Sequence, residues 1–100
     1  MPYERLVGLN VTDAAIYQTY REAIAPLLVK YGGAFRYDFV VANVLKSEAG
    51  HPINRVFALT FKDAASHDGF FSDPEYKAIR VRLFDQSVGG ITIIALYERV

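Results

Sequence analysis

The segment Ile91–Tyr97 is apolar on both sides of the strand that it predicts. Side chains alternate between the two sides of a strand. One side would carry Ile91, Ile93, Ala95 and Tyr97, and the other Thr92, Ile94 and Leu96. The segment Arg55–Phe61 shows the same two-sided pattern. A sheet that contains such strands needs apolar cover on both of its faces.

The first third of the chain predicts a strand followed by a helix. Leu6–Val11 alternates as a strand does, and apolar residues recur at three- and four-residue steps from Ile16 to Tyr31. Thr12 or Asp13 supplies an N-cap oxygen for this helix. Pro26 lies within the apolar stripe and removes one backbone hydrogen bond, so it predicts a bend or a break.

The middle of the chain predicts a hairpin. Gly32-Gly33 is typical of a helix end, and Phe35–Leu45 then alternates as a long second strand. Lys46–Pro52 contains Gly and Pro and predicts a turn. Arg55–Phe61 predicts the third strand, so that the two strands pair across this turn.

The last third predicts two helical pieces and a final strand. Asp63 is suited to cap a short helix, and Asp73-Pro74 gives a sharper start for a second piece. The residue before a proline avoids the α region, which separates the two pieces. Gly89-Gly90 predicts the end of the second piece, before the strand Ile91–Tyr97.

The resulting order, β-α-β-β-α-β, occupies residues 1–100 without a linker or a repeat and predicts a single domain. The order is that of the ferredoxin-like fold in the α+β class: an antiparallel four-stranded sheet with both helices on one face. The helices leave one apolar sheet face uncovered. We therefore expect a homodimer in which two sheets pack face to face around a two-fold axis, as a dimeric α+β barrel.

Composition excludes several classes of function. The 11 basic and 11 acidic residues cancel, so the chain lacks the basic excess that nucleic-acid binding needs. It has no cysteine, and its two histidines lie in separate segments, so we expect no metal and no cofactor. The chain shows no apolar segment long enough to span a membrane and no signal peptide. We expect a cytoplasmic protein.

Two motifs resemble one known family. Tyr20–Leu28 running into Tyr31-Gly32-Gly33, and the aromatic pair Phe70-Phe71 followed by Asp73-Pro74-Glu75-Tyr76, are similar to the DUF1330 family of the dimeric α+β barrel superfamily. That family is a domain of unknown function. Its wider superfamily includes cofactor-independent monooxygenases, haem proteins and isomerases that use the cavity between sheet and helices. The resemblance thus implies a place for a ligand without implying a reaction.

Few residues are candidates for catalysis. His67 lies four residues after Asp63, and we expect these two side chains to pair at the surface rather than to act as a catalytic dyad. Arg36 and Asp38 lie two apart on one side of the second strand. They either discourage aggregation at a sheet edge or line a pocket. His67 and Asp38 are the catalytic candidates, and Arg36 is a candidate for ligand binding.

Three further residues combine a polar group with a buried setting and are candidates for ligand binding: Asn10, Tyr20 and Tyr76. Three functions remain open on these grounds. The first is a homodimer that binds a small organic molecule, as a cofactor-independent enzyme or as a binding protein. The second is a non-catalytic binding or assembly module, in which the aromatic residues only pack. Haem binding through His67 is a third alternative.

Overall fold

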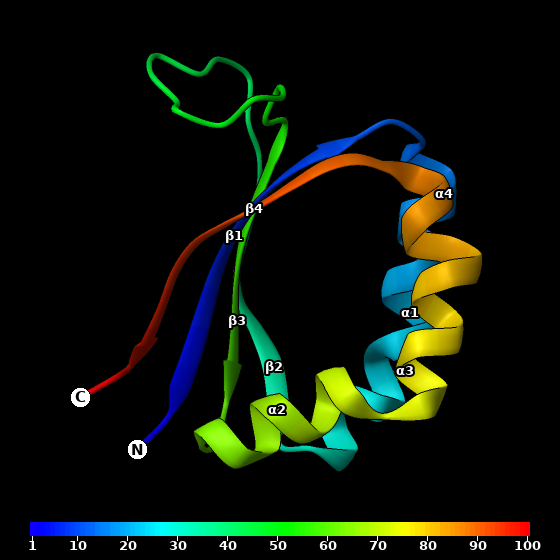
Figure 1. The fold of residues 1–100 in the computed structure, drawn as a ribbon, viewed down its shortest axis with the longest axis vertical. Coiled ribbons are helices and arrows are strands. Elements are labelled where there is room, and N and C mark those ends of the chain that lie inside the picture. The colour runs from blue at the N-terminus through cyan, green and yellow to red at the C-terminus, as the bar shows by residue number, and fades with distance from the viewer.

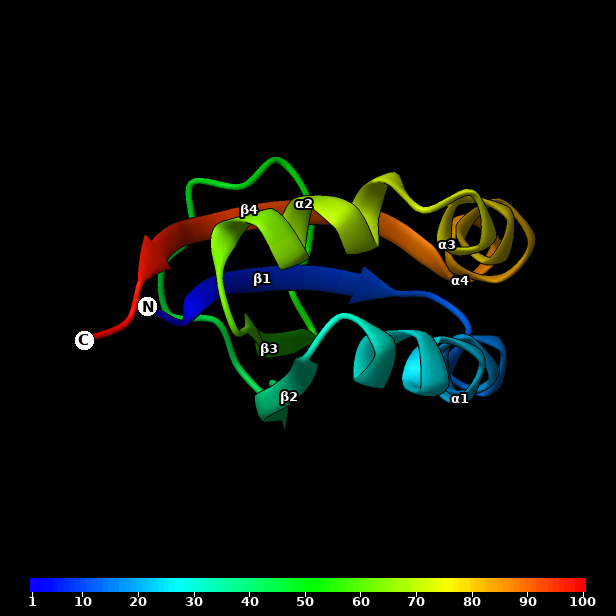
Figure 2. The ribbon, with the colours of Figure 1, turned by 90° about the horizontal axis from the view of Figure 1, so that it is seen from below.

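The computed structural model describes residues 1–100, and four antiparallel strands in the order β2-β3-β1-β4 form its centre. Helices lie on one face of this sheet, while α2 lies across one end of it (Figures 1 and 2). The strands are β1 (Tyr3–Val11), β2 (Gly33–Val40), β3 (Arg55–Phe61) and β4 (Val88–Glu98). The helices are α1 (Ala14–Lys30), α2 (Ala64–Ser72), α3 (Pro74–Ile79), the π-helix η1 (Arg80–Phe84) and α4 (Asp85–Ser87). This is the ferredoxin-like βαββαβ fold, as predicted. No helix is long and apolar enough to cross a membrane.

Local capping signals fix where the helices begin. The Asp13 carboxylate accepts a hydrogen bond from the amide of Ile16 at 3.0 Å, and Asp63 accepts one from Ser66 at 2.8 Å. Asp73 likewise accepts one from the amide of Glu75 at the start of α3. These aspartates satisfy amides that have no partner within their helices. All three predicted caps are therefore confirmed.

Helix α1 is unbroken across Pro26, so a break at this residue is excluded. The Pro26 ring is exposed, on the side of the helix away from the sheet. The ribbon leans toward the sheet over its last turns (Figure 2). Gly32 ends the helix with a φ of +66°, a left-handed conformation that glycine adopts without strain.

Several strand boundaries differ from the predictions, and β1 begins at Tyr3 instead of Leu6. β2 ends at Val40, and residues 41–54 form a long irregular loop instead of a strand and a short turn. The apolar residues of this loop pair with no strand, and Leu45 is almost fully exposed. β4 begins at Val88 and includes Gly89-Gly90, which we expected to lie outside it. Gly90 lies against the ring of His51, so a side chain at this position would clash with that ring.

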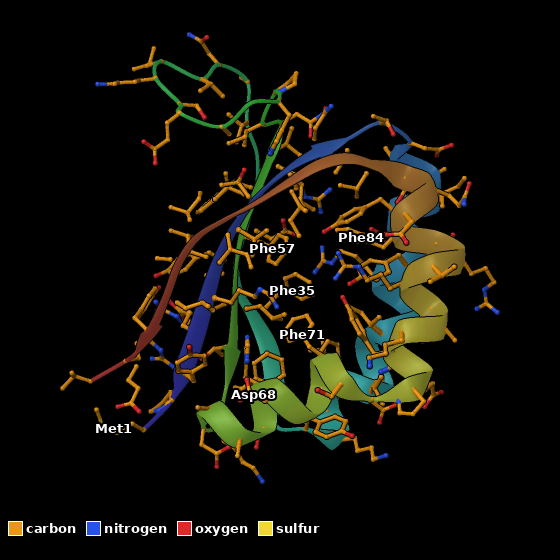
Figure 3. All side chains as sticks on the ribbon, viewed as in Figure 1. Met1, Phe35, Phe57, Asp68, Phe71 and Phe84 are labelled. Carbon is orange, nitrogen blue, oxygen red and sulfur yellow. The ribbon has the colours of Figure 1, made fainter.

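The hydrophobic core lies between the sheet and its helices. Its fully buried side chains come from β1, β3, α1 and α2: Val7, Leu9, Tyr17, Ile24, Phe61 and Phe70. Figure 3 shows Phe35, Phe57, Phe71 and Phe84 pointing into the space between sheet and helices. This layer is the single-sided cover that the element order predicts.

No helix covers the opposite face of the sheet, which we call the bare face (Figure 1). This face carries exposed apolar side chains. Tyr37 and Phe39 stack on this face and are 51% and 54% exposed. A shallow groove runs beside them, lined also by Leu6, Val56 and Tyr97. Exposed apolar surface of this kind is typical of a face that meets a partner.

Candidate functional site

A small cavity lies between the sheet and the helices, and we call it the inner cavity. It encloses about 20 Å³, which is room for about one water molecule. Most of its walls are apolar, and four polar side chains reach into it: Arg5, Tyr20, Tyr76 and Arg80. The cavity thus combines an apolar body with a few polar groups, as ligand sites do.

The structure brings Tyr20 and Tyr76 together in the inner cavity, although 56 positions separate them. Tyr20 comes from α1 and Tyr76 from α3, and their hydroxyl oxygens lie 3.1 Å apart. Burial, with the neighbouring Tyr76, raises the pKa of Tyr20 far above its usual value. The hydroxyl of Tyr20 therefore acts as a neutral hydrogen-bonding group. Asn10 and Arg36, the other two predicted ligand-binding residues, do not line this cavity.

Sequence reasoning missed Arg5, which lies in β1 and lines the inner cavity. Its guanidinium lies over the ring of Phe71, 4.1 Å from the ring centre, and forms no ion pair with any acidic side chain. Burial lowers the pKa of Arg5, and the Arg80 cation lowers it further. Arg5 nevertheless stays charged, because an arginine does not lose its proton at neutral pH.

Asp38 lies outside the inner cavity, in an ion-pair cluster on the same side of the sheet. It accepts two hydrogen bonds from Arg55, at 2.8 and 2.9 Å, and one from Arg21. Beside this cluster, the hydroxyl of Tyr17 is buried without a partner, and burial raises the pKa of Tyr17 to about 12. The carboxylate of Asp38 is occupied by two guanidiniums, which is a structural use of the charge.

Arg36 and Asp38 lie on opposite faces of the sheet, so the prediction that they share a face is wrong. A β-bulge at Arg36 inserts one extra residue, because Phe35 pairs with Leu59 and Tyr37 pairs with its neighbour Ala58. The bulge shifts the alternation, and Arg36 reaches Glu4 on the bare face with contacts of 2.6 and 3.1 Å.

Glu4 is fully buried on the bare face, where it also accepts a hydrogen bond from Tyr97 and lies 3.5 Å from Arg99. The bond to Arg36 is the main reason that the pKa of Glu4 is lowered from its usual value. A lowered folded-state pKa adds stability above the unfolded-state value, and that stability is lost as the pH falls through the folded-state value.

We therefore expect Glu4→Gln to weaken the dependence of stability on pH in acid. Between about pH 5 and pH 3, the free energy of unfolding of the wild type should fall more steeply than that of the variant. Denaturant titrations at several pH values measure both curves. If the two curves run parallel through this range, the pKa of Glu4 is not lowered in the folded protein.

His67 is buried, so the prediction of an exposed pair with Asp63 is wrong. Its ring packs among Tyr3, Phe61 and Phe71, with ring centres 4.9 to 5.4 Å away. Nδ1 lies 2.9 Å from the carboxylate of Asp68, while Nε2 is buried without a partner. His67 does not line the inner cavity. No group of three or more histidine and acidic side chains lies together where a metal ion could bind.

Asn10 lies near the end of β1, where Asn54 attaches the loop of residues 41–54 to this strand. The side-chain amide of Asn54 points to the Asn10 side-chain oxygen at 3.4 Å and donates to the carbonyl of Val11 at 2.9 Å. A second, larger cavity of about 580 Å³ lies between this loop and the bare face. Its walls are mainly apolar, so it continues the exposed apolar surface of the sheet.

The fold defines the class as ferredoxin-like α+β proteins, and comparison with known proteins gives the family. Residues 6–97 match the family described as "Domain of unknown function (DUF1330)", so the chain belongs to this family. A search of curated proteins gave no match.

Solved structures of other proteins share the fold at low sequence identity. A protein of unknown function from Rhodopseudomonas palustris is 16% identical, with a TM-score of 0.82 over 99% of this chain and 82% of its own. A Dabb family protein from Mesorhizobium loti is 13% identical, with a TM-score of 0.67 over 99% and 97%. A dimeric ferredoxin-like protein of unknown function from Jannaschia is 19% identical, with a TM-score of 0.58 over 99% and 100%.

Proposed function

We propose that the protein is a homodimer that binds a small organic molecule in the inner cavity of each protomer. One observation carries the proposal: an aromatic cavity between sheet and helices holds a buried pair of tyrosine hydroxyls. Two hydroxyls that bond each other use only one of their two hydrogens, and the other is free for a third group. Apolar walls with a few convergent polar groups are typical of small-molecule sites.

The homodimer is supported by the bare face and by one of the solved structures. The Jannaschia protein with this fold is described as dimeric. In this chain, the apolar groups Tyr37 and Phe39 and the cavity under the loop of residues 41–54 all lie on the bare face. Two copies packed through these faces would close the dimeric α+β barrel and remove this surface from water.

The small volume of the inner cavity favours the second candidate, a non-catalytic assembly module. At about 20 Å³, the cavity admits no organic ligand unless its walls move outward. The catalytic candidates give no support to a particular reaction, because Asp38 is held by two arginines and His67 lies away from the cavity. The same position of His67 offers no axial ligand for haem on the cavity side. The proposal therefore concerns binding.

Two ring compounds of equal shape, benzoate and its neutral isostere benzamide, test binding in the inner cavity. We expect at least one of them to cause saturable NMR shifts at amides beside the cavity. Ile91→Phe, at the cavity wall, should weaken that binding about tenfold, because the added ring fills the opening. Val81→Phe, on the exposed side of η1, is the matched control and should not change it. If neither compound gives saturable shifts, the assembly module is the better description.

A further inference from the structure

We propose that the natural ligand of the inner cavity is a small planar organic acid, whose carboxylate binds Arg5 while its planar part lies among the phenylalanines. The inference rests on the proposed function of this cavity and names the chemical class of its ligand. Four groups that lie together carry it: Arg5, Arg80, Tyr20 and Tyr76.

The first argument is an arginine that lacks a counterion. The other arginines that are partly buried each have a carboxylate within 4 Å: Glu4 lies beside Arg36 and Arg99, Asp38 beside Arg21 and Arg55, and Asp85 beside Arg80. Arg5 is half-buried, and no acidic side chain lies within 4 Å of it. A half-buried charge without a partner is costly to fold around. An anion that enters the cavity supplies the missing partner.

A second guanidinium adds to the positive charge of the cavity. Arg80 reaches the cavity from η1, and its one acidic neighbour is Asp85, at 3.7 Å on the protein surface. Like charges on opposite walls of one cavity repel each other. A carboxylate between them removes this repulsion and forms charge-assisted hydrogen bonds, which are about twice as strong as neutral ones.

The tyrosine pair supplies a hydrogen-bond donor that matches an anion. Whichever of Tyr20 and Tyr76 donates in their shared bond, the O–H of the other has no acceptor among the side chains around it. A carboxylate has two oxygens that only accept hydrogen bonds. The guanidinium of Arg5 and the free O–H can therefore both donate hydrogen bonds to one carboxylate.

The walls of the cavity favour a flat molecule. Phe71 lies under Arg5, and the guanidinium of Arg80 lies 5.0 Å from the ring centre of Phe84. Both Arg80 and Phe84 belong to the π-helix η1, a rare conformation that is frequent at functional sites. Because the cavity holds only about 20 Å³, the planar part of the acid enters when these side chains move outward.

Titration of benzoate and benzamide into the dimer at physiological salt tests the inference. The two probes share their shape and differ in charge, so the charge is the variable. We expect benzoate to bind at least about tenfold more tightly than benzamide. Arg5→Gln should abolish this preference and leave the affinity for benzamide within about twofold. Arg82→Gln removes one exposed cation outside the cavity and is the matched control, which should keep the preference.

The melting temperature of the Arg5→Gln variant shows whether Arg5 binds a ligand or stabilises the fold. If Arg5 serves to bind an anion, Arg5→Gln should leave the melting temperature of the free protein unchanged or raise it, because the repulsion from Arg80 disappears. If Arg5 instead stabilises the fold through Phe71, the melting temperature should fall. Such a fall, together with an unchanged affinity for benzoate, overturns the inference.

The outcomes also separate this inference from the proposed function. Benzamide that binds the cavity as tightly as benzoate keeps the proposed function and overturns the acid. If benzoate binds the Arg5→Gln variant as tightly as it binds the wild type, the proposed function likewise stands and the proposed acid is overturned. The absence of saturable binding for both probes overturns the two together.

Discussion

Phe39→Lys should convert the proposed homodimer to a monomer, and this is the largest change in assembly that we expect of a single substitution. Phe39 is 54% exposed on the bare face, so its replacement removes little packing within one protomer. In the proposed dimer, the lysine would place an unpaired charge between two apolar sheets. Charges buried without a partner and lost aromatic contacts each weaken association, here by about 2–4 kcal/mol.

Light scattering after size-exclusion chromatography measures this result. The wild type should show twice the chain mass of 11.2 kDa, and the variant should show 11.2 kDa at the same concentration. Val29→Lys is the matched control, since Val29 is 77% exposed on α1, away from the bare face. A lysine near the end of a helix is also favourable. A wild type that elutes as a folded monomer would remove the basis of the homodimer.

The parts of the fold that depend on local chemistry were predictable from the sequence. Asp13, Asp63 and Asp73 each cap a helix as predicted, because a cap needs only an acceptor beside the first turn. β3 covers Arg55–Phe61 with the predicted bounds. Its neighbours in the sheet, β1 and β2, cover both of its edges, so the alternation of the whole segment is expressed as a strand.

The predicted sheet faces are wrong where one extra residue in a strand shifts its pairing with the neighbouring strand. The bulge at Arg36 and a second one at Ile94, where Leu6 pairs with Ala95 and Val7 with Ile93, reverse the alternation within a strand. A bulge depends on hydrogen bonds with the neighbouring strand, and alternation within one segment contains no information about it. Faces assigned by alternation were therefore right on one side of each bulge and reversed on the other.

Only part of the candidate site was predictable from the sequence. Tyr20 and Tyr76 stand out because a tyrosine among buried positions needs a hydrogen-bond partner. Arg5 was missed because the first strand was predicted to begin at Leu6, whereas β1 begins at Tyr3. The alternation of Val7 and Leu9, extended backward, places Arg5 on the same inward side. A charged residue in such an apolar row is the signal that identifies the inner cavity.

Asp38→Asn should cause the largest loss of stability within a protomer. Asp38 is 17% exposed in its side chain and holds Arg21 and Arg55 together. Asparagine keeps the shape and removes the charge, so two guanidiniums would face each other without an anion. Breaking a buried ion pair costs about 3–5 kcal/mol, and partial exposure reduces this to about 2–3 kcal/mol. Denaturant unfolding at neutral pH and fixed protein concentration measures the loss.

Asp85→Asn is the matched control for this substitution. Asp85 also has an arginine neighbour, Arg80, but its side chain is 51% exposed and the pair is 3.7 Å apart, so its loss should cost less than about 0.5 kcal/mol.

The double variant Asp38→Asn with Arg21→Gln distinguishes repulsion between the guanidiniums from the loss of hydrogen bonds. If the two guanidiniums repel each other once the carboxylate is gone, removing one of them should restore part of the stability. An equal or larger loss in the double variant would mean that the hydrogen bonds of Asp38, and not its charge, hold β2 to α1.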